Sequence, residues 1–169
     1  MLDPNVAYVP APWSNFFSAE LGASAALTGL LFVAISINLA RVLAFPHLTP
    51  RAAKALTTLI GVLFTASFCL VPGQSKNLLA VELVVLGAAI WIVITVMYLR
   101  HSRGNPYMRA GQKLTYGALA QLSTLPLVVC GVSLLYARGG GLYWLVPAVI
   151  LSFASALFDA WVLLIEIQR

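Results

Sequence analysis

The chain alternates long uncharged stretches with short segments that hold most of its charged residues. Leu21 to Ala40 has no charge over twenty residues, and Leu114 to Ala137 has none over twenty-four. An α-helix needs about twenty apolar residues to cross the hydrocarbon core of a bilayer. Five long, mainly apolar stretches are separated by turn signals such as Pro72-Gly73 and the glycine run 139–141. The pattern therefore predicts five transmembrane helices.

The predicted fold class is all-α, a polytopic membrane helical bundle that forms one transmembrane domain over residues 1–169. The second span is the weakest, because Lys54 and several hydroxyl residues lie in it. Pro126 is expected to kink the fourth span, and residues 138–141 are expected to form a flexible break. The spans are predicted at about 18–41, 51–71, 76–99, 113–137 and 142–167.

Composition supports a membrane protein. Hydrophobic residues make up 61% of the chain and charged residues 9%, whereas soluble domains carry roughly 25% charged residues. Eight basic residues fall on one side of a five-span topology and two, Lys76 and Arg138, on the other. Cytoplasmic loops are enriched in Lys and Arg. This asymmetry predicts an N-terminus outside and a C-terminus in the cytoplasm. It also explains the net charge of +5 without nucleic-acid binding.

The first span carries small residues in its outer half, including Gly22 and Gly29. Small residues let two helices approach closely in lipid, so we expect close helix contact near Glu20. Glu20, Ser24 and Thr28 recur at intervals of four and share one helix face. Together with Gln74 and Glu82 they are candidate polar or pore-facing residues. The alternative is that the stripe is a helix-packing seam and that the carboxylates are hydrated or ion-paired at the membrane boundary.

Asp159 lies about eight residues from the inner end of the fifth span, a depth of roughly 12 Å. Gln121 is predicted at matching depth, and Asn38 lies shallower on the same side. One interpretation is a buried polar cluster of these three residues that fixes the bundle. The other is an element of a proton or ion relay, which would need a complementary acid or histidine within the membrane. His47 and His101 are both predicted in cytoplasmic loops.

The sequence shows no catalytic constellation, and we predict that the protein is not an enzyme. Cys69 and Cys130 lie in apolar stretches without a CxxC pattern. Histidine is missing from the predicted spans, which argues against haem. No Walker, GxSxG, HExxH or GxGxxG pattern occurs. We therefore predict no catalytic, metal or cofactor-binding residues.

Two phrases carry a resemblance to a known group of proteins. They are Glu20-x-Gly22-Ala23-Ser24-Ala25-Ala26, which continues as an apolar run to Leu39, and Leu70-Val71-Pro72-Gly73-Gln74-Ser75. The first half of the chain in this way resembles small multi-pass bacterial proteins, some of them labelled modulators of the FtsH protease. The resemblance implies a bacterial inner-membrane location and an accessory role, and it assigns no functional residue.

Three hypotheses for function follow. The first is a non-enzymatic accessory or regulatory subunit that acts through helix–helix contacts. The second is a small homo-oligomeric ion channel with its mouth near Glu20 and Glu82. The third is a structural subunit of a respiratory or photosynthetic membrane complex. In each case the expected partners are the lipid bilayer and either further copies of the chain or a larger membrane protein complex.

Overall fold

The computed structural model describes residues 6–45, 48–104 and 110–168. Within these ranges every regular element is a helix, in agreement with the predicted all-α class. His47, Arg109 and Arg169 lie outside the described residues. In chain order the elements are η1 (Val6–Tyr8), η2 (Ala11–Trp13), α1 (Ser14–Ile37), α2 (Leu39–Ala44), α3 (Leu48–Cys69), α4 (Lys76–Gly104), α5 (Ala110–Tyr136), η3 (Gly141–Trp144) and α6 (Leu145–Gln168).

Five of the described helices are long and apolar enough to cross a membrane, as the hydropathy pattern predicts. The weakest predicted span, α3, is among them despite Lys54. The first predicted span ends early. Asn38 leaves helical geometry with φ −107° and ψ 19°, and its side-chain amide donates to the Ala34 carbonyl of its own helix. The chain then turns into the short helix α2.

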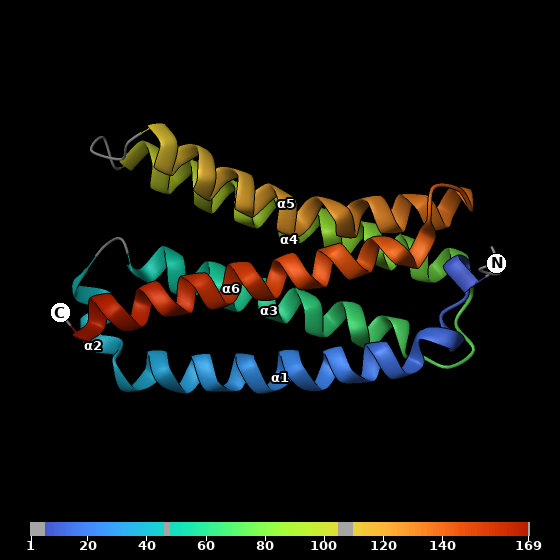
Figure 1. The fold of residues 1–169 in the computed structure, drawn as a ribbon, viewed down its shortest axis with the longest axis horizontal. Helices are drawn as coiled ribbons and strands as arrows, with labels where there is room; N and C mark the ends of the chain where they lie inside the picture. The colour runs from blue at the N-terminus through green and yellow to red at the C-terminus, as the bar shows by residue number, and fades with distance from the viewer. Residues whose placement is uncertain (1–5, 46–47, 105–109, 169) are drawn as a thin grey trace.

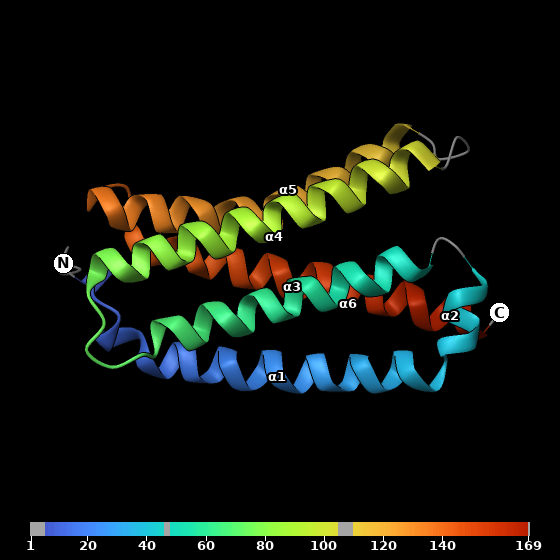
Figure 2. The same cartoon turned by 180° about the vertical axis from the view of Figure 1, so that it is seen from behind.

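The five long helices form three layers (Figures 1 and 2). Helices α3 and α6 lie side by side in the middle layer. Helix α1 packs against α3 on one side, and the α4–α5 pair covers the other side. We refer to the end formed by α2, the start of α3 and the end of α6 as the α2 end. The opposite end, formed by η1, η3 and the start of α6, is the η3 end.

Glycine brings α4 and α5 into close contact. A Cβ added at Gly131 would lie 2.6 Å from Val84 Cγ2 and 2.8 Å from the Val84 backbone nitrogen. A Cβ added at Gly87 would lie 3.0 Å from Val128 Cγ2 and 3.2 Å from its backbone nitrogen. Residues without a side chain are required where two helix backbones approach this closely. The two helices are therefore fixed as one antiparallel pair, and α5 continues as one helix through Pro126.

The predicted break at residues 138–141 is confirmed, because α5 ends at Tyr136 and η3 begins at Gly141, and hydrogen bonds hold this turn. Gly139, Gly140 and Gly141 have positive φ angles of 88°, 105° and 52°, which glycine adopts readily. The Gly141 amide donates to Ser133 Oγ at 2.8 Å, and the Gly140 amide donates to the Tyr8 hydroxyl at 3.3 Å. The N-terminal segment thus packs over the α5–η3 turn and closes the η3 end.

Helix α1 is the least covered of the five candidate spans. Only 6% of its membrane-length window is buried, against 33% to 56% for the other four. Its covered face places Leu27, Leu31 and Ile35 against residues of α3 and α6. The opposite face of α1 contacts no other part of the described chain closely enough to be buried.

Candidate functional site

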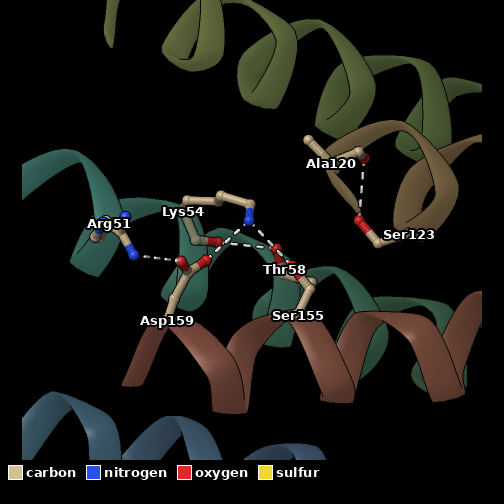
Figure 3. A network of polar contacts seen from close by, with 7 residues as sticks. All are labelled: Arg51, Lys54, Thr58, Ala120, Ser123, Ser155 and Asp159. Carbon is tan, nitrogen blue, oxygen red and sulfur yellow. Dashed lines mark hydrogen bonds and ion pairs between the residues drawn. The ribbon is translucent and has the colours of Figure 1, made fainter. Parts of the chain in front are cut away.

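The described residues contain one fully buried acid, Asp159 on α6, and it is paired with bases on α3 (Figure 3). Lys54 Nζ donates to Asp159 Oδ2 at 2.8 Å and to Ser155 Oγ at 3.0 Å. Arg51 Nη1 lies 3.7 Å from Asp159 Oδ1. Ser155 and Asp159 are one turn apart, and so are Arg51 and Lys54, so each helix presents two of these four side chains on one face.

This ionic cluster connects the two helices of the middle layer. Lys54 is 2% exposed and Asp159 0%, so neither charge is hydrated. Taking both charges out of water is costly, and their attraction recovers that cost only with good geometry and further hydrogen bonds. The short Lys54–Asp159 contact and the Ser155 hydroxyl supply part of this, whereas Asp159 Oδ1 is buried without a hydrogen bond. The cluster can hold α3 against α6.

A small, mainly apolar cavity adjoins the cluster toward the middle of the bundle. Thr58 lies one turn beyond Lys54 and donates to its carbonyl at 2.9 Å. Ser152 on α6 donates to the Ser123 carbonyl of α5 at 3.1 Å. The cavity volume is about 20 Å³, enough for a water molecule, which needs about 10–15 Å³. A space of this size does not pass a hydrated ion. Hydroxyl residues on its wall are Thr58, Thr65, Ser123, Thr124 and Ser152.

The three residues predicted to form one buried polar cluster do not come together. Asp159 is buried, but its partners are on α3. Gln121 instead connects α5 to α4, since its Oε1 accepts from the Trp91 indole and its Nε2 donates to Thr95 Oγ1 at 3.3 Å. Asn38 bonds within its own helix and lies on the wall of a groove between α1 and α6. These three residues were predicted to be neighbours from their depth along the helices. Their side chains point in different directions, and so they do not meet.

Lys54 is the functional candidate that sequence reasoning missed. Its charge was interpreted only as a weakness of the second span. Its opposite charge to Asp159, on the same side of the membrane, was a usable signal, because ionisable residues in spans usually pair with each other. The missing information was which face of α3 turns toward α6.

The candidate pore-facing residues point into the protein or bond to each other. Ser24 is fully buried and donates to the Leu21 carbonyl, and Thr28 donates to the Ser24 carbonyl at 2.7 Å. This side of α1 faces α3, as expected for a packing seam. Gln74 Nε2 donates to Glu82 Oε2. No hydrogen bond among the described residues joins Glu20 to that pair, and Glu20 Oε2 is buried without a hydrogen bond.

The uncovered side of α1 forms a continuous surface of small side chains, which we call the small-residue face. Its members are exposed, and a Cβ added at Gly22 or Gly29 would meet no atom within 4 Å. Their spacing places them within one face of a helix with 3.6 residues per turn. The face points away from α3, opposite the side that carries Ser24. It consists of Ser18, Gly22, Ala25, Ala26 and Gly29.

The fold and these sites define a multi-pass helical bundle with five candidate membrane spans and no group of three or more metal-ligating side chains among its described residues. Comparisons with family models, curated proteins and solved structures gave no match. The resemblance to the FtsH-modulator group therefore stays a prediction.

Proposed function

We propose that this protein is a non-enzymatic accessory or regulatory subunit of the inner membrane of a bacterium, and that it binds a transmembrane helix of another polypeptide on the small-residue face of α1. The observation that carries the proposal is the contrast between the residues of this face and its lack of cover. Only 6% of the residues in the membrane-length window of α1 are buried, yet the outward side of the helix holds two glycines and two alanines where lipid-facing positions normally carry larger apolar side chains.

The physical reason is the balance of forces between helices in lipid. Hydrophobic burial gives no net drive for association there, so helices associate through close van der Waals packing of small residues. Glycine in a helix interior costs about 1 kcal/mol relative to alanine. A second helix that packs against Gly22 and Gly29 would recover this cost, whereas lipid chains would not.

Orientation is part of the proposal. The basic residues favour the α2 end in the cytoplasm and the η3 end outside. Arg41, Arg51 and Lys54 are at the α2 end, whereas Lys76 and Arg138 are at the other. With this orientation the small-residue face lies in the outer half of the membrane.

Photo-crosslinking tests the proposal. A photoreactive amino acid replaces Ala26 on the small-residue face, and in a matched protein it replaces Val85, an exposed residue of α4. Illumination of native membranes is expected to give a discrete polypeptide adduct from position 26 and only lipid adducts from position 85. Lipid adducts alone at both positions would contradict the proposal. The mass of the adduct distinguishes a second copy of this chain from a different partner.

A further inference from the structure

A second uncovered feature of α1 is a groove that it forms with α6. The groove has a volume of about 440 Å³. Its walls come from α1, α6 and one residue of α3, and all are apolar except Asn38 and the indole nitrogen of Trp161. It lies on a different side of α1 from the small-residue face, because its α1 wall holds Leu27, Leu30 and Ala34.

The groove is long enough along α1 for an extended acyl chain. It runs from Leu27 to Asn38, a length of about 16 Å at 1.5 Å per residue.

The length of the groove matches one leaflet of a membrane. The hydrocarbon core of a bilayer is about 30 Å thick, so one leaflet contributes about 15 Å. The groove begins near the middle of α1 and ends at Asn38, where α1 gives way to α2. It therefore extends from the centre of the membrane to the surface at the α2 end.

The surface end of the groove carries more basic than acidic residues, since Arg41 and Arg51 lie there with one acid, Glu166, one turn after Leu163. Val42 of α2 is buried against Leu163, which also lines the groove, so α2 lies at its end. Arg41 precedes Val42 and is exposed, and Arg51 on α3 is close by, because it faces Asp159 one turn before Leu163. Basic residues between helix ends on one membrane surface attract anionic lipid head groups.

We propose that the α1–α6 groove binds one acyl chain of an anionic phospholipid, with the lipid phosphate at the α2 end beside Arg41. The groove's apolar wall accounts for the chain, its length accounts for the single leaflet, and the arginine accounts for the charge of the head group. This site is independent of the small-residue face.

Two variants at neighbouring positions test the acyl-chain part. Ala34→Trp fills the groove, whereas Val33→Trp adds the same side chain at an exposed position outside its wall. Each purified protein is incubated with phosphatidylglycerol and its bound lipid is counted by native mass spectrometry. We expect one tightly bound lipid in the parent and in Val33→Trp, and at least a tenfold lower occupancy in Ala34→Trp. Equal occupancy in the two variants would overturn the proposal.

The head-group part is tested with phosphatidylglycerol and phosphatidylcholine that carry identical chains. The parent protein is expected to prefer phosphatidylglycerol about tenfold, and Arg41→Gln is expected to lose most of this preference. Arg100→Gln, an exposed arginine of α4 at the same end, is the control and is expected to keep it. Equal binding of both lipids by the parent would overturn the assignment of an anionic ligand.

A measurement without a groove variant covers the case in which Ala34→Trp fails to fold. Trp161 lines the groove, and Trp91 is an exposed residue outside it. Phosphatidylglycerol with brominated chains is added as a minor component of phosphatidylcholine bilayers. The fluorescence of each tryptophan is obtained as the signal that is lost when it is replaced, in Trp161→Phe and in Trp91→Phe. Stronger quenching of Trp161 than of Trp91 is expected, and equal quenching would overturn the proposal.

Discussion

Glycine occurs on two helix surfaces of this molecule that differ in what covers them. Between α4 and α5, Gly87 and Gly131 face backbone atoms of the neighbouring helix so closely that no larger residue fits. On α1, Gly22 and Gly29 face open space. The first pair shows how this chain uses glycine, namely to bring helix backbones together. By the same physical reasoning, the second pair is the basis of the proposal that a helix of another molecule packs there.

The exposed side of α4 is the reference with which the exposed side of α1 is compared. There the residues that face outward are large and apolar, as expected where a helix contacts lipid chains. They include Val81, Val85, Ile92 and Val96. In the half of α1 nearer the η3 end, the residues that face outward are also exposed, but their side chains are small. Lipid contact therefore does not explain the composition of the small-residue face, whereas helix contact does.

The largest expected effect comes from filling the covered glycine surface. Gly131→Leu places a side chain where a Cβ alone would lie 2.6 Å from Val84 and 2.8 Å from its backbone. Overpacking of this kind typically costs 1–3 kcal/mol or more, and here backbone must move, so we expect loss of most folded protein. Gly29→Leu is the matched control and is expected to leave the melting temperature in detergent unchanged or slightly raised. Equal destabilisation by both variants would remove the distinction between the two surfaces.

The next largest effect is expected in the ionic cluster between α3 and α6. Asp159→Asn removes the negative charge that balances Lys54 and Arg51. Removing one partner of a buried ion pair costs about 3–5 kcal/mol of folding stability. Thermal unfolding in micelles should show this loss. Because α1 packs on α3, partner retention should fall together with stability, whereas Gly29→Leu lowers partner retention alone.

The double variant Lys54→Met with Asp159→Leu tests whether the ion pair itself stabilises the fold. It removes both buried charges and is expected to recover most of the stability that Asp159→Asn loses. A double variant as unstable as Asp159→Asn would show that the cluster contributes more than the mutual neutralisation of its charges.

The smallest effect is expected on the α3-facing side of α1. Glu20→Gln removes the carboxylate whose Oε2 is buried without a hydrogen bond, and it should change the free energy of unfolding by less than about 1 kcal/mol. Ion flux into liposomes that contain the protein should be the same for parent and variant. A flux that depends on Glu20 would instead favour the oligomeric channel hypothesis.

The spans could be predicted from sequence because about twenty mainly apolar residues have few alternatives to a transmembrane helix. Contacts between helices were harder to predict. Asp159 was identified as a polar residue of the core, but its partner Lys54 was not, since periodicity along one helix does not say which face meets which neighbour. The stripe of Glu20, Ser24 and Thr28 was similarly ambiguous, and the burial of Ser24 places it against α3.

In the turn at residues 138–141, composition did not reveal the contacts that hold the segment. The run Gly139-Gly140-Gly141 suggests flexibility when only composition is considered. In the structure, each of these glycines takes a positive φ angle, and the turn is held by Ser133 and by Tyr8, which lies more than 130 residues earlier in the chain. Interactions at this sequence separation leave no local signal.

The most direct test of the central claim is the mass of the assembly that contains this protein when native membranes are extracted into lipid nanodiscs. The parent chain is expected to carry a second polypeptide in fixed stoichiometry. The double variant Gly22→Leu with Gly29→Leu is expected to fold normally and to appear as a single chain. An unchanged mass in the double variant, or a parent that is already a single chain, would contradict the claim that the small-residue face of α1 binds a helix.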